Sequence, residues 1–195
     1  MLVKDVKVLF RLATGSRAKG TLKERLDHFY KHQADDYDGF RERLLQGRRE
    51  LFSSVALDEG ALWVDLGGGT GASLQFWGDR LNALKKGYIV DLCPSLLEKA
   101  RERIDGHGWN HVEAVESDVL DFVPPEGKAD FVTFSYSLTM IPEWTRALDH
   151  ALEILRPGGI IGVVDFYVSR KFPREGGKTH GAFTRGFWPL WFQMD

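Results

Sequence analysis

The part of this sequence best suited to chemistry is a glycine-rich run that follows an apolar segment and precedes a helical one. The run reads Val64-Asp65-Leu66-Gly67-Gly68-Gly69-Thr70-Gly71. Clustered glycines let the backbone come close to a ligand and adopt positive φ angles. Four glycines in five residues are more than a simple turn needs, so the run predicts a cofactor-binding loop at a strand-to-helix junction.

Two kinds of cofactor fit such a loop. Gly67, Gly69 and Ala72 match the G-x-G-x-x-A fingerprint of dinucleotide sites, and Asp91 follows at about the distance that this fingerprint requires. Asp65 is not part of the fingerprint. Its carboxylate could accept hydrogen bonds from an ammonium group or from loop amides, but it would repel a pyrophosphate. Asp65 therefore counts against a nicotinamide-dependent oxidoreductase, which stays as the alternative from another enzyme class.

The loop and the segments after it resemble the class I S-adenosylmethionine-dependent methyltransferases, from Trp63 to Asp165. The first motif of that family is an acidic residue followed by G-x-G-x-G, which residues 65–71 match. Asp91 matches the acid that takes both ribose hydroxyls, and Asp118 matches the acid that takes the adenine amino group. Each of these two acids could instead simply cap the helix that follows it. Further family landmarks are matched by residues 130–135 and by Leu155-Arg156-Pro157-Gly158-Gly159.

The resemblance implies S-adenosylmethionine as cofactor, S-adenosylhomocysteine as product and no metal ion. Tyr136 and Tyr167 follow the fourth and fifth expected strands, where aromatic faces could position a methyl acceptor that becomes cationic. The expected cofactor-binding residues are Asp65, Gly67, Gly68, Gly69, Gly71, Asp91, Leu92, Asp118, Val119, Ser135 and Tyr37.

The elements that must position these residues follow from the alternation of short apolar runs with helical patterns. The expected fold class is α/β, a Rossmann-like, mostly parallel sheet with helices on both faces and an N-terminal helical extension. Strands that are apolar on both sides predict helices on both faces. We expect strands at 61–66, 87–92, 111–115, 129–135 and 160–167, and helices at 71–84, 94–105 and 143–155.

The chain divides into three expected parts. Residues 1–58 form an N-terminal helical lid or substrate segment, in which Thr21 and Glu24 predict a capping box and a further helix covers about 40–55. Residues 59–168 form the cofactor-binding core. Residues 169–195 form an aromatic-rich segment that does not have the pattern of the antiparallel strand pair usual at the end of this fold, so that pair is expected to be missing from the chain.

The composition narrows the partners. A net charge of −2 argues against nucleic acid, whose binding needs a strongly basic face. The single cysteine, Cys93, allows no disulfide within the chain and fits a reducing compartment. We therefore expect a cytoplasmic protein that acts on a small molecule or a lipid.

Some segments also resemble the N-methyltransferase of betaine-lipid synthesis, which trimethylates the amine of diacylglycerylhomoserine. They are residues 37–45, 133–142, 165–169 and 187–192. This resemblance implies peripheral contact with a membrane, for which the Trp188 to Phe192 cluster is a candidate. The alternatives are a methyltransferase for phosphatidylethanolamine, a quinone precursor or another small molecule, and a cofactor-binding module without turnover.

Overall fold

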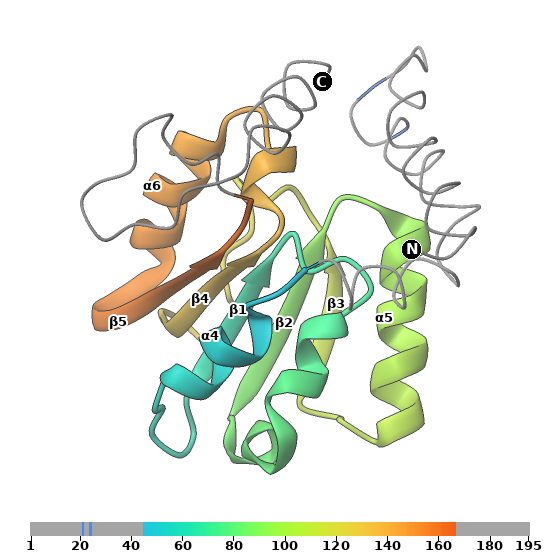
Figure 1. Cartoon of the computed structure of the whole chain (residues 1–195), viewed down its shortest axis with the longest axis vertical. Coiled ribbons are helices and arrows are strands. Elements are labelled where there is room, and N and C mark those ends of the chain that lie inside the picture. The colour runs from blue at the N-terminus through green and yellow to red at the C-terminus, as the bar shows by residue number, and fades with distance from the viewer. Residues whose placement is uncertain (1–20, 22–23, 25–44, 167–195) are drawn as a thin grey trace, which may run out of the picture. The chain divides into compact units, whose positions relative to one another are not determined.

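The computed structural model describes residues 21, 24 and 45–166. Within residues 45–166 the chain forms a five-stranded sheet in the order β3-β2-β1-β4-β5, and every pair of neighbouring strands is parallel (Figure 1). The expected Rossmann-like fold class is therefore confirmed. The strands are β1 (Leu62–Leu66), β2 (Lys86–Asp91), β3 (Val112–Glu116), β4 (Ala129–Ser135) and β5 (Leu155–Val164).

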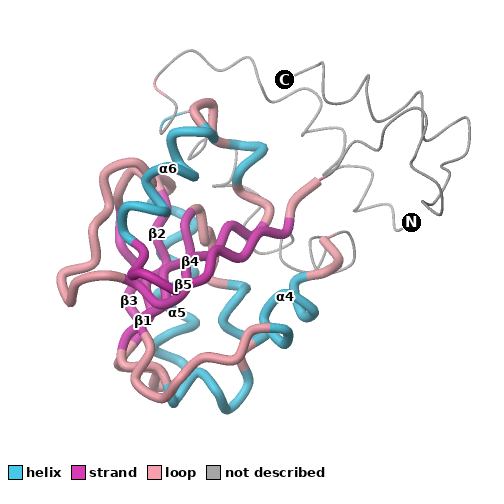
Figure 2. Tube along the Cα trace, turned by 90° about the vertical axis from the view of Figure 1, so that its left-hand side faces the viewer, coloured by secondary structure: helices cyan, strands magenta, loops and turns pink. Residues whose placement is uncertain are grey.

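Helices cover both faces of the sheet, because alternate residues of the central strands point to opposite sides. On one face, Trp63 and Ile89 pack with Phe52 of α4 (Arg48–Ser54) and Leu97 of α5 (Pro94–His107). On the other face, residues such as Val64 and Val90 pack with α6 (Trp144–Ile154). Figure 2 shows the sheet edge-on, with α6 on one side and α4 and α5 on the other.

The connection between β1 and β2 differs from expectation. The sequence predicts one helix over 71–84, but the chain forms two consecutive 3-10 helices, η2 (Ala72–Phe76) and η3 (Gly78–Ala83). Gly78 has a φ of 57°, which an α-helix does not accommodate, so the helical path breaks there. A third short 3-10 helix, η4 (Leu138–Met140), lies between β4 and α6.

The start of β5 was also predicted wrongly. We expected Pro157-Gly158-Gly159 to end the preceding helix and the strand to begin at Ile160, but α6 ends at Ile154 and β5 begins at Leu155. Leu155 pairs with Ala129 and Ile160 pairs with Phe131, so residues 156–159 form a bulge opposite one residue of β4. Pro157 has no N–H to donate and Gly158 has a φ of 78°, which suits a bulge rather than a regular ladder.

In the N-terminal part, the predicted capping box is confirmed. The backbone N–H of Thr21 donates to the Glu24 carboxylate over 2.8 Å, and the Glu24 N–H donates to the Thr21 hydroxyl over 3.3 Å. Among the described residues, no helix has the length and apolar character needed to cross a membrane.

Candidate functional site

A cavity of about 170 Å³ lies beyond the carboxyl ends of β1, β2, β3 and β4. In an open parallel sheet this edge holds ligands where the strand order reverses, which here is between β1 and β4. We call its two sides the β1–β3 wall and the β4 wall. The β1–β3 wall consists of Gly67, Gly69, Asp91, Leu92, Leu96, Asp118, Val119 and Leu120, and the β4 wall of Tyr136, Ser137, Met140, Ile141, Pro142 and Glu143.

The glycine loop is built so that its backbone, not side chains, faces the cavity. The N–H groups of Gly67 and Gly68 both donate to the carbonyl of Val90, over 2.8 and 3.0 Å. Gly67 has a φ of 73°, and a Cβ there would come within 2.5 Å of the Ser137 Cβ. Because a side chain at this position is both strained and blocked, the requirement for glycine is physical.

Asp91 joins this loop to the next one. One oxygen of its carboxylate accepts the Gly69 N–H and the other accepts the Cys93 N–H, both over 2.9 Å. The alternative reading of Asp91 as a helix cap does not hold, because the N-cap residue of α5 is Cys93 and no side chain caps that helix. The Asp91 carboxylate also lines the cavity, where it can accept hydrogen bonds from hydroxyl groups.

Asp118 lines the cavity and also shapes its own loop. Its carboxylate accepts the Leu120 N–H over 2.9 Å, and its carbonyl accepts the N–H groups of Asp121 and Phe122. The alternative role of Asp118 as a helix cap is wrong, because a turn at residues 119–121 follows it and no helix lies between β3 and β4. A loop held this way presents the Asp118 carboxylate in a fixed place, which suits recognition of an amino group.

Asp65, in contrast, lies beneath the loop and is not part of the cavity lining. Its side chain is fully buried and accepts hydrogen bonds from Ser73 Oγ over 2.5 Å and from Thr133 Oγ1 over 2.7 Å. Burial raises the pKa of Asp65 to about 6, against the opposing effect of the two hydroxyls. Asp65 therefore braces the loop against β4 and does not line the cavity.

Tyr136 takes an unusual backbone conformation at the end of β4. Among the described residues, it is the one non-glycine residue with a positive φ, at 58°. Such strain costs about 1–2 kcal/mol and is found mostly where function fixes a side chain. The Tyr136 hydroxyl donates to the carbonyl of Gln46 over 2.6 Å, and burial raises the pKa of Tyr136, so the phenol stays neutral at pH 7.

The structure brings most of the predicted cofactor residues together. The cavity is lined by Gly67, Gly69, Asp91, Leu92, Asp118 and Val119, and by the predicted acceptor residue Tyr136. Asp65, Gly68, Gly71 and Ser135 lie close by in sequence but outside the lining. Tyr37 and Tyr167 fall outside the described residues.

The sequence reasoning missed most of the β4 wall. Residues from Ser137 to Glu143, apart from Leu138 and Thr139, line the cavity because η4 folds the chain back over the sheet edge after β4. Ser137 anchors this fold, since its hydroxyl donates to the carbonyl of Leu66 over 2.7 Å. The sequence signal that could have identified these residues is their position, because a loop directly after a central strand lies at this edge of the sheet.

The charged residues that line the cavity, within the described part of the chain, are all acidic. Asp91, Asp118 and Glu143 contribute carboxylates, and the described lining includes no lysine, arginine or histidine. Arg146, an exposed residue of α6 outside the lining, pairs with Glu143 over 2.5 Å and also attracts Asp118, so it offsets part of this negative charge. The cavity therefore favours ligands that carry or develop positive charge.

The residues fit the cofactor implied by the sequence. The carboxylates of Asp91 and Asp118 line the cavity together with Gly67 and Gly69, and they could accept hydrogen bonds from ribose hydroxyls and an adenine amino group. The lining also includes Leu92, Leu96 and Val119, which offer apolar surface to an adenine ring. S-adenosylmethionine carries a sulfonium cation, which matches the acidic character of the cavity.

Comparison with known proteins points to the same family. A family model described as a methyltransferase domain matches residues 37–194. The chain is 25% identical over 171 residues to the ubiquinone/menaquinone biosynthesis C-methyltransferase UbiE of Salmonella arizonae, an alignment that covers 85% of this chain and 68% of that protein. The UbiE of Salmonella newport matches equally well.

Solved structures share the fold. An O-methyltransferase family protein from Burkholderia thailandensis matches with a TM-score of 0.62 and 26% identity, over 82% of this chain and 50% of that one. A SAM-dependent methyltransferase from Thiobacillus denitrificans, in complex with S-adenosyl-L-homocysteine, matches with a TM-score of 0.52 and 18% identity, over 80% of this chain and 54% of that one. This chain thus spans about half the length of these two structures.

Proposed function

We propose that this chain, which belongs to the methyltransferase-domain family and is an S-adenosylmethionine-dependent methyltransferase, methylates an amine on a lipid head group. The homoserine amine of diacylglycerylhomoserine is the acceptor that we propose first. The β1–β3 wall would hold the cofactor, and the β4 wall would meet the acceptor.

The observation that carries this proposal is the charge of the cavity lining. Asp91, Asp118 and Glu143 surround it, and no basic side chain lines it within the described part of the chain. An amine acceptor is cationic before it loses its proton and cationic again after methylation. Glu143, in the wall that meets the acceptor, attracts both forms, and the two carboxylates on the cofactor side add to this attraction at longer range. A quinol acceptor must lose a proton to become an anion, which the same carboxylates would repel.

Methyl transfer requires few further groups from the protein. When bound, S-adenosylmethionine supplies an electrophilic methyl group on a sulfonium. The chain's own task is to hold the acceptor nitrogen in line with that methyl group and to keep its lone pair free. Tyr136 offers an aromatic face, which can hold a nitrogen through successive increases in methylation. The carboxylate of Glu143 is a candidate for holding the ammonium form before its proton leaves.

A lipid substrate suits the surface beside the β4 wall. Met140 lines the cavity and is 46% exposed, and Trp144, at the first turn of α6, is 52% exposed. Apolar and tryptophan side chains at a cavity mouth favour the interfacial region of a membrane. We therefore propose peripheral membrane contact through this loop. The aromatic cluster at residues 188–192 falls outside the described residues.

A second candidate is C-methylation of a quinone precursor, because the UbiE proteins that match this chain carry that activity in their names. The apolar part of the lining, from residues such as Leu96, Leu120 and Ile141, could accept a ring. The acidic lining argues against it, since a reacting quinol develops negative charge.

The test is a methyl-transfer assay with radiolabelled S-adenosylmethionine and three acceptors offered in parallel. These are diacylglycerylhomoserine, phosphatidylethanolamine and a demethylated quinol, each in the same detergent micelles. We expect label in the betaine lipid, with mono-, di- and trimethylated products separated by thin-layer chromatography. Label in the quinol alone would refute the amine proposal and leave the methyltransferase class intact. Label in phosphatidylethanolamine alone would support an amine acceptor but would refute diacylglycerylhomoserine as the substrate.

A further inference from the structure

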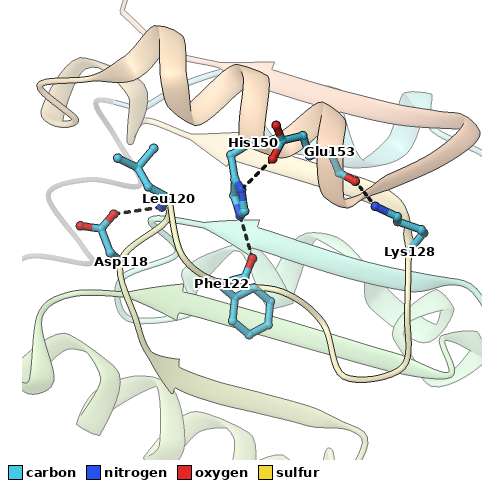
Figure 3. Close-up of polar contacts among 6 residues, drawn as sticks. All are labelled: Asp118, Leu120, Phe122, Lys128, His150 and Glu153. Atoms are coloured by element: carbon cyan, nitrogen blue, oxygen red, sulfur yellow. Dashed lines mark hydrogen bonds and ion pairs between the residues drawn. The ribbon is translucent and has the colours of Figure 1, made fainter.

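The segment between β3 and β4 forms one part of the β1–β3 wall, and it is fastened to α6. Asp118, Val119 and Leu120 line the cavity, and the chain then runs past Phe122 to Lys128 before β4 begins. We call residues 117–128 the β3–β4 loop. Figure 3 shows this loop beside α6.

Two hydrogen bonds join the loop to α6, and an ion pair within α6 lies beside them. The His150 Nε2 lies 2.8 Å from the carbonyl of Phe122 (Figure 3). Because a carbonyl can only accept, Nε2 must carry the proton that is shared. Lys128 donates through Nζ to the carbonyl of Glu153, and the Glu153 carboxylate lies 3.7 Å from His150 Nδ1.

The His150 contact is in a position to matter for the cavity. The Phe122 carbonyl lies at the end of the turn in which Asp118 accepts the N–H groups of Leu120 and Phe122. Phe122 itself is 7% exposed, and its ring lies 5.1 Å from that of Tyr88. The contact is partly buried, so a Phe122 carbonyl that loses His150 is poorly placed to replace it with water, and the turn would shift to find another donor.

We infer that His150 is a positioning residue for the cofactor: it holds the Asp118 turn in the place where Asp118, Val119 and Leu120 meet the adenosine part of S-adenosylmethionine. Glu143, the N-cap residue of the same helix, lines the cavity in the β4 wall. Helix α6 therefore connects the two walls, and the inference holds whatever the methyl acceptor proves to be.

The test compares His150→Leu, which keeps the volume and removes the donor, with His150→Gln, which keeps a side-chain N–H. Calorimetry measures the Kd of S-adenosylhomocysteine and, separately, of adenosine. We expect His150→Leu to weaken the binding of both ligands by the same factor. That factor should be roughly 5- to 10-fold, because one hydrogen bond is lost. His150→Gln should recover most of that affinity.

His107→Ala is the matched control. His107 Nδ1 contacts the Arg103 carbonyl over 2.8 Å, the same kind of bond, but within α5 and away from the cavity lining. The His107→Ala variant should have Kd values for both ligands within two-fold of those of the wild type. A purely structural role for His150 predicts a lower Tm with both Kd values unchanged, and that result would overturn the inference.

Two other results would overturn it as well. Equal affinities for the Leu and Gln variants would show that the hydrogen bond is irrelevant. Weaker binding of S-adenosylhomocysteine with unchanged binding of adenosine would place the effect elsewhere in the cavity. If His150→Leu does not fold, the Gln variant against wild type and the Glu153→Gln variant, which leaves the Phe122 bond in place, carry the comparison. Under the inference both variants then bind adenosine within three-fold of wild type, and a larger loss in either contradicts it.

Discussion

The two walls of the cavity hold their polar groups in different ways. In the β1–β3 wall, Asp91 accepts two backbone N–H groups from two different loops, and Asp118 accepts one from its own turn. In the β4 wall, Glu143 pairs with Arg146 on the exposed side of α6, and Tyr136 reaches back to Gln46, a residue 90 positions away. The carboxylates of one wall are held by backbone N–H groups, whereas in the other wall Glu143 is held by a side chain three residues away and Tyr136 by a carbonyl 90 residues away.

This difference matches the two tasks of the site. A cofactor that is the same in every turnover can be met by carboxylates locked in place by the backbone. Acceptors differ between enzymes of one fold, and the residues that meet them can vary because the sheet does not depend on them. Mutations in the β1–β3 wall should therefore change cofactor affinity, and mutations in the β4 wall should change the use of the acceptor.

The largest effect is expected at Asp91. Asp91→Ala should weaken S-adenosylhomocysteine binding by roughly 2–4 kcal/mol, the value of two charge-assisted hydrogen bonds, as measured by calorimetry. It should also lower the free energy of unfolding by about 1–2 kcal/mol, because the N–H groups of Gly69 and Cys93 lose their acceptor. Glu98→Ala, at an exposed position of α5, is the control and should change neither quantity.

Asp91→Asn separates the two roles, since its amide oxygen can still accept one of the two N–H groups. A variant that is destabilised but binds S-adenosylhomocysteine as tightly as wild type would show that Asp91 is only a brace between two loops. The distinction between the walls would then lose its main support.

The next effect concerns Asp65, beneath the glycine loop. Its folded-state pKa of about 6 lies above the ordinary value of 3.8, so the folded protein holds this proton more tightly than the unfolded chain does. The contribution of Asp65 to stability is therefore present at low pH and is lost as the pH rises toward and through 6. Between pH 4 and pH 7 the loss should be about 2 kcal/mol.

Asp65→Asn cannot titrate, so the measurement is the difference in unfolding free energy between wild type and this variant across that pH range. Relative to wild type, the unfolding free energy of the variant should increase by about 2 kcal/mol as the pH rises from 4 to 7. Binding of S-adenosylhomocysteine at pH 7 should change little, because Asp65 does not line the cavity. A large loss of affinity with no pH-dependent difference in stability would make Asp65 a ligand of the cofactor instead.

Most of the β1–β3 wall could be predicted from the sequence, because its signals are local. The glycine cluster and Asp91 each follow directly on a buried apolar run, and parallel strands bring their carboxyl ends to one edge. The predicted bounds of β1 to β4 lie within one residue of those observed. Gly67 can be recognised in the sequence as part of the glycine cluster. Ser137, which a Cβ at Gly67 would meet, cannot be recognised there as its neighbour.

The rest depends on contacts that no local pattern encodes. The burial of Asp65 follows from Thr133, which reaches it from β4 across the sheet. The early start of β5 follows from the pairing of Leu155 with Ala129, which a Pro-Gly-Gly run would not suggest. The place of Glu143 at the cavity requires the turn of η4 over the sheet edge.

The smallest of the expected effects tests the β4 wall at Tyr136. Tyr136→Ala should lower kcat/KM for the lipid amine by roughly 5- to 30-fold, the value of one cation–aromatic contact, while the Kd of S-adenosylhomocysteine stays within about three-fold. Tyr136→Phe keeps the ring and loses the bond to the Gln46 carbonyl. It should therefore behave like wild type if the aromatic face holds the acceptor, and like the Ala variant if the bond to Gln46 is what matters.

Tyr88→Phe removes a comparable hydroxyl bond, 2.7 Å to Glu126, outside the cavity lining, and should leave turnover unchanged. A Tyr136→Ala variant that loses cofactor affinity in proportion to turnover would show that the two walls do not act separately.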